Sequence, residues 1–160
     1  MSSAGPDSDP PAPLPPDAPA PLRLLWARWR AVAVYHPPTL DDFPFDSLVV
    51  ESPGLAVLKR ETGSRGRVDY RFVAVGPDHL RNTGVDLPQR PLSDLVHPRL
   101  LPQVMEAYAR IFEQGEPHYW EFANAVYGAP HVSYQRLLAP LFEPDGTVTH
   151  AIGSWCWRDD

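Results

Sequence analysis

The stretch Val132–Trp157, VSYQRLLAPLFEPDGTVTHAIGSWCW, says more about the fold than any other part of the chain. Its middle, Glu143–Gly146, holds a proline that fixes φ, an aspartate that offers a local side-chain hydrogen bond and a glycine that accepts the left-handed conformation of a tight reversal. The flanks Tyr134–Leu138 and Val148–Ile152 are rich in β-prone residues. The sequence therefore predicts one long β-hairpin in this part of the chain.

The composition is that of a small globular protein. A chain of 160 residues has room for one domain with tails, and hydrophobic residues at 43% suffice for a core. The net charge of −6, with arginines scattered among acidic neighbours, leaves no basic stripe for phosphates, so we expect no nucleic-acid partner. The single cysteine, Cys156, excludes an intrachain disulfide framework and is typical of a reducing cytoplasm.

The sequence shows neither a leader nor a membrane span. No charged-then-apolar start is present, and no apolar run approaches the roughly 20 residues that cross a bilayer. We therefore expect a cytoplasmic protein without a membrane partner. Residues 1–21 are rich in proline and alanine without apolar periodicity, which predicts a disordered tail. The domain is expected to span residues 22–160.

The domain is predicted to begin with a helix over residues 22–35, which His36-Pro37-Pro38 ends. Five apolar residues recur at helical spacing on one stripe of it: Leu22, Leu25, Trp26, Trp29 and Val32. A stripe with two tryptophans needs a cover, and two interpretations are open. The stripe packs on the domain's own sheet, or it forms the interface of a homodimer.

Strands and helices follow in a recognisable order. Asp41–Ser52 is predicted to be an irregular connector. Runs of β-branched and aromatic residues predict strands, whereas apolar residues at helical spacing, with proline starts and glycine stops, predict helices. The strands are expected at Leu55–Arg60, Val68–Val75 and His118–Tyr127, and the helices at Pro77–Asn82, Pro91–Val96 and Leu101–Gln114.

This order, together with several short motifs, resembles the PAS domain. The motifs are Leu25-Trp26 with Trp29, Asp42-Phe43-Pro44, Tyr70–Gly76, Thr83–Leu87, and Tyr134–Leu141 with Asp145-Gly146. The chain is similar to a bacterial, alphaproteobacterial-type subfamily of single-domain PAS proteins over about Leu22–Trp157. It departs from that pattern at Pro77-Asp78, where a small or hydroxyl residue is expected after Gly76.

The resemblance implies an α+β fold. Its five-stranded antiparallel sheet would carry short helices and one long connecting helix on one face, with the amphipathic helix added at the N-terminus. It also implies a sensor or adaptor in bacterial signalling that acts by binding a small ligand, by protein–protein contact, or by both. A homodimer and an unidentified signalling protein are the partners it suggests. A fold does not fix a function, so the site must be argued from its residues.

Eight residues are candidates for lining a ligand cavity between the sheet and the helices: Tyr70, Phe72, Leu80, Leu95, Tyr108, Phe112, Trp120 and Phe122. The same residues can form a solid core, because protein interiors are normally close-packed. Arg71 stands between two of these aromatics on a predicted central strand. It either points inward and attracts an acidic ligand, or it points out to a carboxylate such as Glu143.

The sequence leaves the cofactor undetermined. A haem would need an inward histidine, and only His79 and His97 lie near the short helices. A flavin-adduct photosensor would need a cysteine in the helical region, but Cys156 falls in the last strand, where we predict an inert, buried thiol. The six histidines show no spacing typical of a metal site.

No residues form a convincing catalytic constellation, so we do not predict an enzyme. The alternative is a small α+β cone-fold enzyme of the isomerase or dehydratase type, with His118 or His150 as its base. Glu121 and Arg136 lie in neighbouring predicted strands, and we expect them to form a cross-strand ion pair with a structural role.

Overall fold

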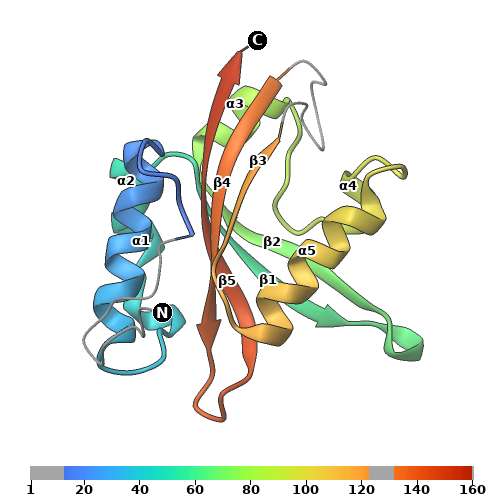
Figure 1. The fold of residues 1–160 in the computed structure, drawn as a ribbon. Coiled ribbons are helices and arrows are strands. Elements are labelled where there is room, and N and C mark those ends of the chain that lie inside the picture. Colours follow the sequence, from blue (N-terminus) through green and yellow to red (C-terminus); the bar gives the residue numbers. More distant parts are fainter. Residues whose placement is uncertain (1–12, 123–131, 160) are drawn as a thin grey trace, which may run out of the picture.

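Five antiparallel strands form one sheet through the middle of the molecule (Figure 1). The structure, a computed structural model, describes residues 13–122 and 132–159. The strands are β1 (Leu55–Thr62), β2 (Val68–Val75), β3 (His118–Phe122), β4 (Val132–Phe142) and β5 (Val148–Asp159). Their order is β2-β1-β5-β4-β3, so the first strand pairs with the last. The predicted five-stranded antiparallel sheet is confirmed, and the part of the third predicted strand after Phe122 lies outside the described residues.

The hairpin predicted from Val132–Trp157 is confirmed. β4 and β5 pair antiparallel from one end to the other. In the turn, Gly146 has a φ of +89°, and its N–H donates to the carbonyl oxygen of Glu143 at 2.9 Å. The carboxylate of Asp145 accepts the N–H of Thr147 at 3.0 Å. The residue types that predict the turn are therefore the ones that close it.

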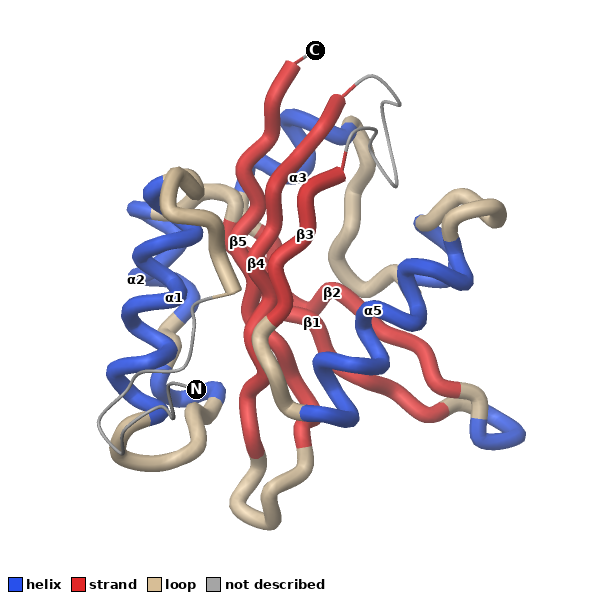
Figure 2. Tube along the Cα trace, viewed as in Figure 1, coloured by secondary structure: helices blue, strands red, loops and turns tan. Residues whose placement is uncertain are grey.

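Helices cover both faces of the sheet (Figure 2). The longer helices are α1 (Ala20–Ala33) and α5 (Leu101–Gln114), and the shorter elements are η1 (Leu40–Asp42), α2 (Phe45–Glu51), η2 (Ser64–Gly66), α3 (Pro77–Thr83) and α4 (Leu92–Leu95). α1 and α2 lie on one face, whereas α4 and α5 lie on the other. α5 has the bounds that the sequence predicts, and Gly115, with a φ of +68°, ends it.

The connector predicted to be irregular contains a helix. Within Asp41–Ser52, α2 forms because Phe45, Leu48 and Val49 recur at helical spacing and pack against the core beneath α1. Pro44 precedes its first residue in an extended conformation. A helix of 7 residues offers only one such apolar group, so its period is hard to separate from chance in the sequence.

Helices bury both faces of the sheet, and successive residues of a strand contribute to the two cores in turn because their side chains point to opposite sides. The α5-face core holds most of the buried aromatic side chains, among them Tyr70, Phe72, Tyr108, Phe112 and Trp155. The α1-face core is largely aliphatic and includes Leu22, Val57, Leu137, Leu141 and Ile152. Each fully buried side chain of this size contributes about 1.5–3 kcal/mol relative to exposure. The two cores thus hold the two helical layers on the sheet.

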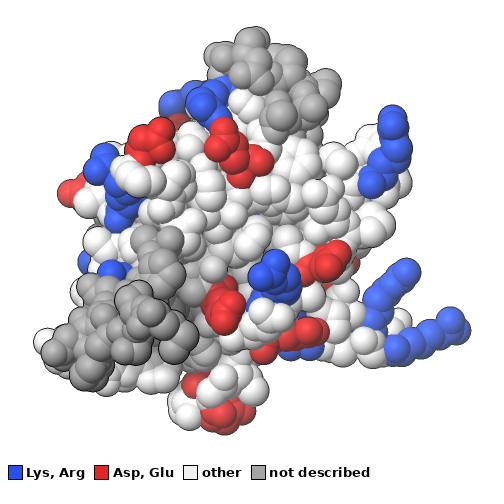
Figure 3. Space-filling model, in the orientation of Figure 1, with Lys and Arg blue, Asp and Glu red and all other residues white. Residues whose placement is uncertain are grey.

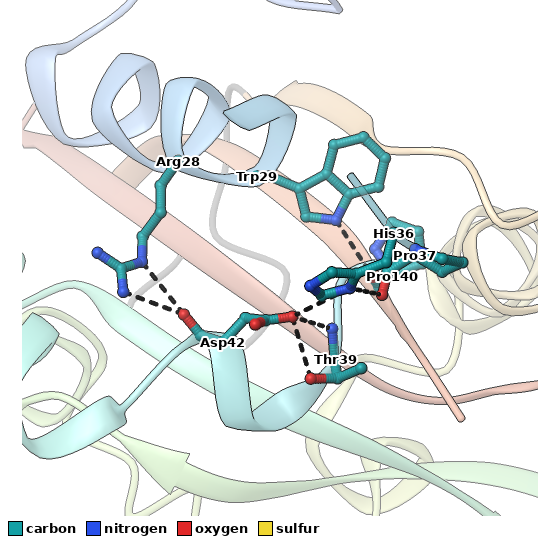
Figure 4. A network of polar contacts seen from close by, with 7 residues as sticks. All are labelled: Arg28, Trp29, His36, Pro37, Thr39, Asp42 and Pro140. Atoms are coloured by element: carbon teal, nitrogen blue, oxygen red, sulfur yellow. Dashed lines mark hydrogen bonds and ion pairs between the residues drawn. The ribbon is translucent and has the colours of Figure 1, made fainter. Parts of the chain in front are cut away.

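Polar contacts fasten α1 and the loop after it to the rest of the domain (Figure 4). The indole N–H of Trp29 donates to the carbonyl oxygen of Pro140 on β4 at 2.9 Å. The guanidinium of Arg28 donates twice to the carbonyl oxygen of Asp42, at 3.3 and 3.0 Å. The carboxylate of Asp42 in turn accepts the backbone N–H of Thr39 at 2.8 Å. α1 is therefore a fixed layer of the domain.

The predicted dimer stripe lies mostly against this sheet. Leu22 is fully buried and Leu25 is 6% exposed, so the prediction that these two form a dimer interface is wrong. Trp26 and Trp29 stack with ring centroids 5.8 Å apart, and both are half-buried, as is Val32. The interpretation that the stripe packs on the domain's own sheet is the one that the structure supports.

Part of the predicted tail also packs on the domain. Ala18 is 2% exposed, and its carbonyl oxygen accepts the Nε–H of Arg23 at 2.9 Å. Leu14 packs against the α1-face core. The packed part of the chain therefore begins before Leu22, while residues 1–12 lie outside the described residues.

Candidate functional site

The candidate site is the face of the sheet beneath α3, α4 and α5. The ring of Tyr70 meets those of Phe112 and Tyr108 at centroid distances of 4.9 and 5.4 Å, and Phe72 lies 6.0 Å from Trp155. Of the predicted lining residues, those buried in this core are Tyr70, Phe72, Tyr108 and Phe112, and those packed against it are Leu95, Trp120 and Phe122. Whether they enclose a ligand stays a prediction.

Leu80 is wrong as a lining residue. It is 56% exposed, whereas its neighbour His79 is fully buried. Successive residues of a helix are rotated by about 100°, so α3 can turn only one of the two toward the sheet. The inward residue is the histidine.

Arg71 points away from the core. Its Nε–H donates to Glu61 at 3.0 Å and a second nitrogen bonds the carbonyl oxygen of Gln89, so its carboxylate partner is Glu61 rather than the expected Glu143. Arg71 lines a groove of about 580 Å³ at the β1–β2 hairpin, where Figure 3 shows Lys and Arg side chains projecting at the right of the view. An inward acidic-ligand site at Arg71 is therefore wrong.

His79 is a buried polar side chain within the α5-face core. Its Nε2–H donates to the carbonyl oxygen of Gly54 at 2.8 Å, so Nδ1 carries the free lone pair of the neutral ring. The rings of His79 and Trp155 lie 4.9 Å apart, and among the described residues neither Nδ1 of His79 nor Nε1 of Trp155 has a hydrogen-bond partner. Burial lowers the pKa of His79 to about 4, so the ring is neutral at pH 7.

Arg136 is a buried charged residue on this face, and it does not pair with Glu121 as predicted. The register places Trp120 opposite Arg136 and Glu121 opposite Gln135. Because side chains alternate along a strand, Glu121 points away from Arg136, and it accepts a hydrogen bond from Arg158 at 2.8 Å. Arg136 is instead 1% exposed and lies in the interior.

The remaining candidate groups lie elsewhere. His97 is exposed, and its Nδ1 accepts the N–H of Arg99 at 3.2 Å. Cys156 is half-buried, and burial raises the pKa of its thiol to about 11. In residues 13–122 and 132–159, no three His, Cys, Asp or Glu side chains lie close enough to share a metal ion.

The histidines of the enzymatic alternative contact no described carboxylate directly; Glu143 reaches His150 only through the hydroxyl of Thr149 and acts on its charge from a distance. His150 contacts the hydroxyl of Thr149 at 3.0 Å, and His118 contacts Arg136 at 3.2 Å, but neither has a hydrogen bond to a described carboxylate. A general base of this type needs an orienting partner of the kind that neither ring has here. The geometry therefore does not favour the cone-fold enzyme.

None of the described helices combines the length and the apolar character needed to cross a bilayer.

Comparison with protein-family models and with curated proteins yields no match. Solved structures do match. One of them is a light-oxygen-voltage domain studied with a flavin analogue. Its alignment with this chain covers 74% of this chain and 88% of that domain, with a TM-score of 0.53 and 18% identity.

The chain has the PAS fold. Two further similar structures are a sensory box sensor histidine kinase from Vibrio cholerae and the PAS domain of BvgS from Bordetella pertussis. The first has a TM-score of 0.46 and 14% identity, and its alignment covers 86% of this chain and 93% of the kinase chain. The second has a TM-score of 0.43 and 14% identity, and its alignment covers 71% of this chain and 82% of the BvgS chain. At these identities the likeness concerns the fold of the PAS domain.

Sequence reasoning missed His79 and Arg136 as members of the site. The sequence suggests His79 only as a haem ligand, and Arg136 only as half of a cross-strand ion pair with a structural role. A signal for Arg136 exists, since Tyr134, Arg136 and Leu138 share one parity of a strand and two of the three are apolar. No comparable signal tells which residue of the short helix faces inward.

Proposed function

We propose that this chain is a PAS-type sensor of bacterial signalling that binds a small molecule on its α5 face and passes the change to a signalling protein in the cytoplasm. Binding would shift the packing of the helices between two states, by no more than the difference in ligand affinity between those states. The resemblance to single-domain bacterial PAS proteins and the single cysteine support this setting.

The observation that carries the proposal is the set of buried polar groups on the α5 face. A core that serves only stability has no need to bury His79 and Arg136, because each desolvated polar group costs free energy unless it has a partner. His79 Nδ1 offers an acceptor and Trp155 Nε1 offers a donor to an incoming molecule. Inward polar groups among aromatic walls are typical of ligand sites.

Native mass spectrometry of freshly purified protein tests this proposal, together with a melting-temperature screen of small molecules. A retained or screened ligand is expected to raise the melting temperature by mass action, and His79→Phe is expected to weaken that effect. Arg99→Gln, a surface change, serves as the control. A protein that retains nothing, responds to no compound and still captures its partner would be an interaction module instead.

A homodimer through α1 remains part of the proposal, but through its outward side. Leu24, Ala27, Ala31 and Val34 follow a spacing of three, four and three residues, and all four are exposed, Leu24 by 59% and Val34 by 75%. This spacing is that of a helix–helix seam, which two copies of α1 would bury together. The cover of this stripe would thus be a second copy of the chain.

Sedimentation of Leu24→Glu tests the dimer. This variant is expected to be monomeric and still folded, because the side chain lies outside the monomer's core. Leu80→Glu is the matched control, since Leu80 is 56% exposed on another element and should leave the dimer intact. An unchanged dimer in both variants would remove α1 from the interface.

A further inference from the structure

The guanidinium of Arg136 is a buried charge without a counter-charge in the described chain. It lies between the rings of Tyr108 on α5 and Trp120 on β3, at 5.5 and 5.4 Å from their centroids. None of the ion pairs among the described residues includes it. Buried charges in proteins are normally paired, because their desolvation is costly and aromatic faces offset only a part of it.

The hydrogen bonds of Arg136 lead to a single residue. Its two terminal nitrogens donate to the carbonyl oxygen and to Nδ1 of His118, at 3.4 and 3.2 Å. A guanidinium only donates, so Nδ1 holds a lone pair and the proton of the neutral ring is on Nε2. Burial, together with the charges of Arg136 and Arg110, lowers the pKa of His118 to about 4. At pH 7 the imidazole is therefore a neutral donor that adds no negative charge.

His118 and Trp120 also line a pocket of about 210 Å³ between α5 and β3, together with Gln103, Glu106, Ala107 and Arg110. Arg110 forms no ion pair within the described residues. The pocket thus has one cation on its wall, a second behind His118, and one carboxylate, Glu106. Ala107 and the indole of Trp120 supply its apolar wall, and Gln103 adds a neutral amide.

We infer that this pocket binds a small monocarboxylate. The carboxylate would accept hydrogen bonds from Arg110 and from Nε2–H of His118, and its negative charge would offset the buried charge of Arg136. Two cations against one carboxylate leave room for a single negative charge, whereas Glu106 would repel a dianion. The aromatic wall suits a short apolar stem. The inference rests on the proposed sensory function only in that it names the ligand class.

Sodium acetate and sodium propionate are the probes, compared with sodium chloride at equal ionic strength. Either carboxylate is expected to raise the melting temperature of the wild type, and Arg110→Gln is expected to weaken binding about tenfold, as for the loss of one charge-assisted hydrogen bond. Arg90→Gln removes another exposed cation, which lines no part of the pocket, and this variant should bind as the wild type does. Equal stabilisation of the wild type and Arg110→Gln would overturn the inference.

Imidazole resonances of His118 give a second readout that does not depend on a folded Arg136→Met variant. The charged residues around the ring are Arg136, Arg110, Glu106 and Glu116. Bound acetate adds a negative charge, so the resonances should shift and the pKa of His118 should rise in the wild type, but not in Arg110→Gln. Unshifted imidazole resonances of His118 would overturn the proposed site, and stronger binding of phosphate than of acetate would overturn the assignment of the ligand as a carboxylate.

The same data separate this inference from the sensory proposal. A neutral ligand that is retained independently of Arg110 leaves the sensor in place and removes the carboxylate site. Acetate that binds at His118 without altering dimerisation or capture of a signalling protein leaves the site in place and removes the sensor.

Discussion

The two faces of the sheet bury different chemistry. Beneath α1 the core is aliphatic, and the polar groups near it, such as the indole N–H of Trp29, have partners on neighbouring elements. Beneath α5 the core holds most of the buried aromatic side chains, and it encloses His79 and Arg136, which leave a polar atom and a charge unpaired in the described chain. On the α5 face, Nδ1 of His79 and Nε1 of Trp155 have no hydrogen-bond partner among the described residues, and these are the atoms on which the proposed ligand site depends.

One residue runs against this contrast. The hydroxyl of Ser154 is buried on the α1 face, as its alternation with Ile152 and Cys156 requires, and it has no hydrogen-bond partner among the described residues. An unpaired neutral hydroxyl is less costly to bury than a charge. The contrast therefore concerns the buried histidine and arginine side chains of the described residues, His79 and Arg136, which both lie on the α5 face.

The largest expected effect is on the α1 face. Leu22→Ala should lower the free energy of unfolding by about 2–5 kcal/mol, because the side chain is fully buried between α1 and the sheet. Urea denaturation measures this change. Leu24→Ala, on the outward side of the same helix, should stay within about 0.5 kcal/mol. Similar small losses in both variants would mean that α1 does not pack on the sheet in solution.

The next effect belongs to the α5 face and depends on pH. The pKa of His79 is about 4 in the folded chain and 6.5 in the unfolded chain, so acid favours unfolding. The stability that the fold gains from the neutral ring of His79 is fully present above pH 6.5 and is lost as the pH falls toward 4. Between pH 7 and pH 5 the loss should be about 2 kcal/mol for this residue.

Denaturation of His79→Gln at several pH values tests this dependence. The variant should lose less stability than the wild type between pH 7 and pH 5, although His118, whose pKa is also lowered, keeps part of the slope. His97→Gln removes an exposed histidine and should retain the full slope. An identical slope in wild type and His79→Gln would show that the ring is not buried neutral.

Much of the fold could be predicted because its signals are local. Alternation and turn chemistry fix β2 and the β4–β5 hairpin, and proline and glycine fix the ends of α5. The site was harder because it depends on the register of distant segments. A shift of one residue between β3 and β4 decides whether Trp120 or Glu121 lies opposite Arg136. No local pattern contains that register.

A smaller effect tests how α1 is fastened. Trp29→Phe keeps an aromatic ring but removes the hydrogen bond to Pro140, so it should cost about 1 kcal/mol. The stabilisation by acetate should be unchanged, because the altered contact lies on the opposite face. Trp26→Phe is the control, since its indole nitrogen makes no hydrogen bond within the described residues. A change in acetate response would show that the two faces are coupled.

The smallest effect concerns Asp42, which fastens the loop after α1. Hydrogen bonds from the backbone N–H of Thr39, and then from its hydroxyl at 3.0 Å, lower the pKa of this carboxyl below its ordinary value. The charged form is therefore favoured in the folded chain. Asp42→Asn should cost from a few tenths to about 1 kcal/mol at neutral pH, because a charge-assisted hydrogen bond becomes a neutral one.

The difference between Asp42→Asn and the wild type should shrink in acid. A lowered pKa stabilises the fold above the ordinary pKa of the group, and this stabilisation is lost as the pH falls through the lowered value. Unfolding free energies measured at neutral and at acid pH should therefore converge. Asp41→Asn is the matched control, because Asp41 is exposed and makes no hydrogen bond to a described residue through its side chain. If both aspartates gave the same small loss at every pH, the hydrogen bonds from Thr39 to the Asp42 carboxylate would contribute nothing to stability, and α1 would be held by its core contacts and by the hydrogen bonds of Arg28 and Trp29.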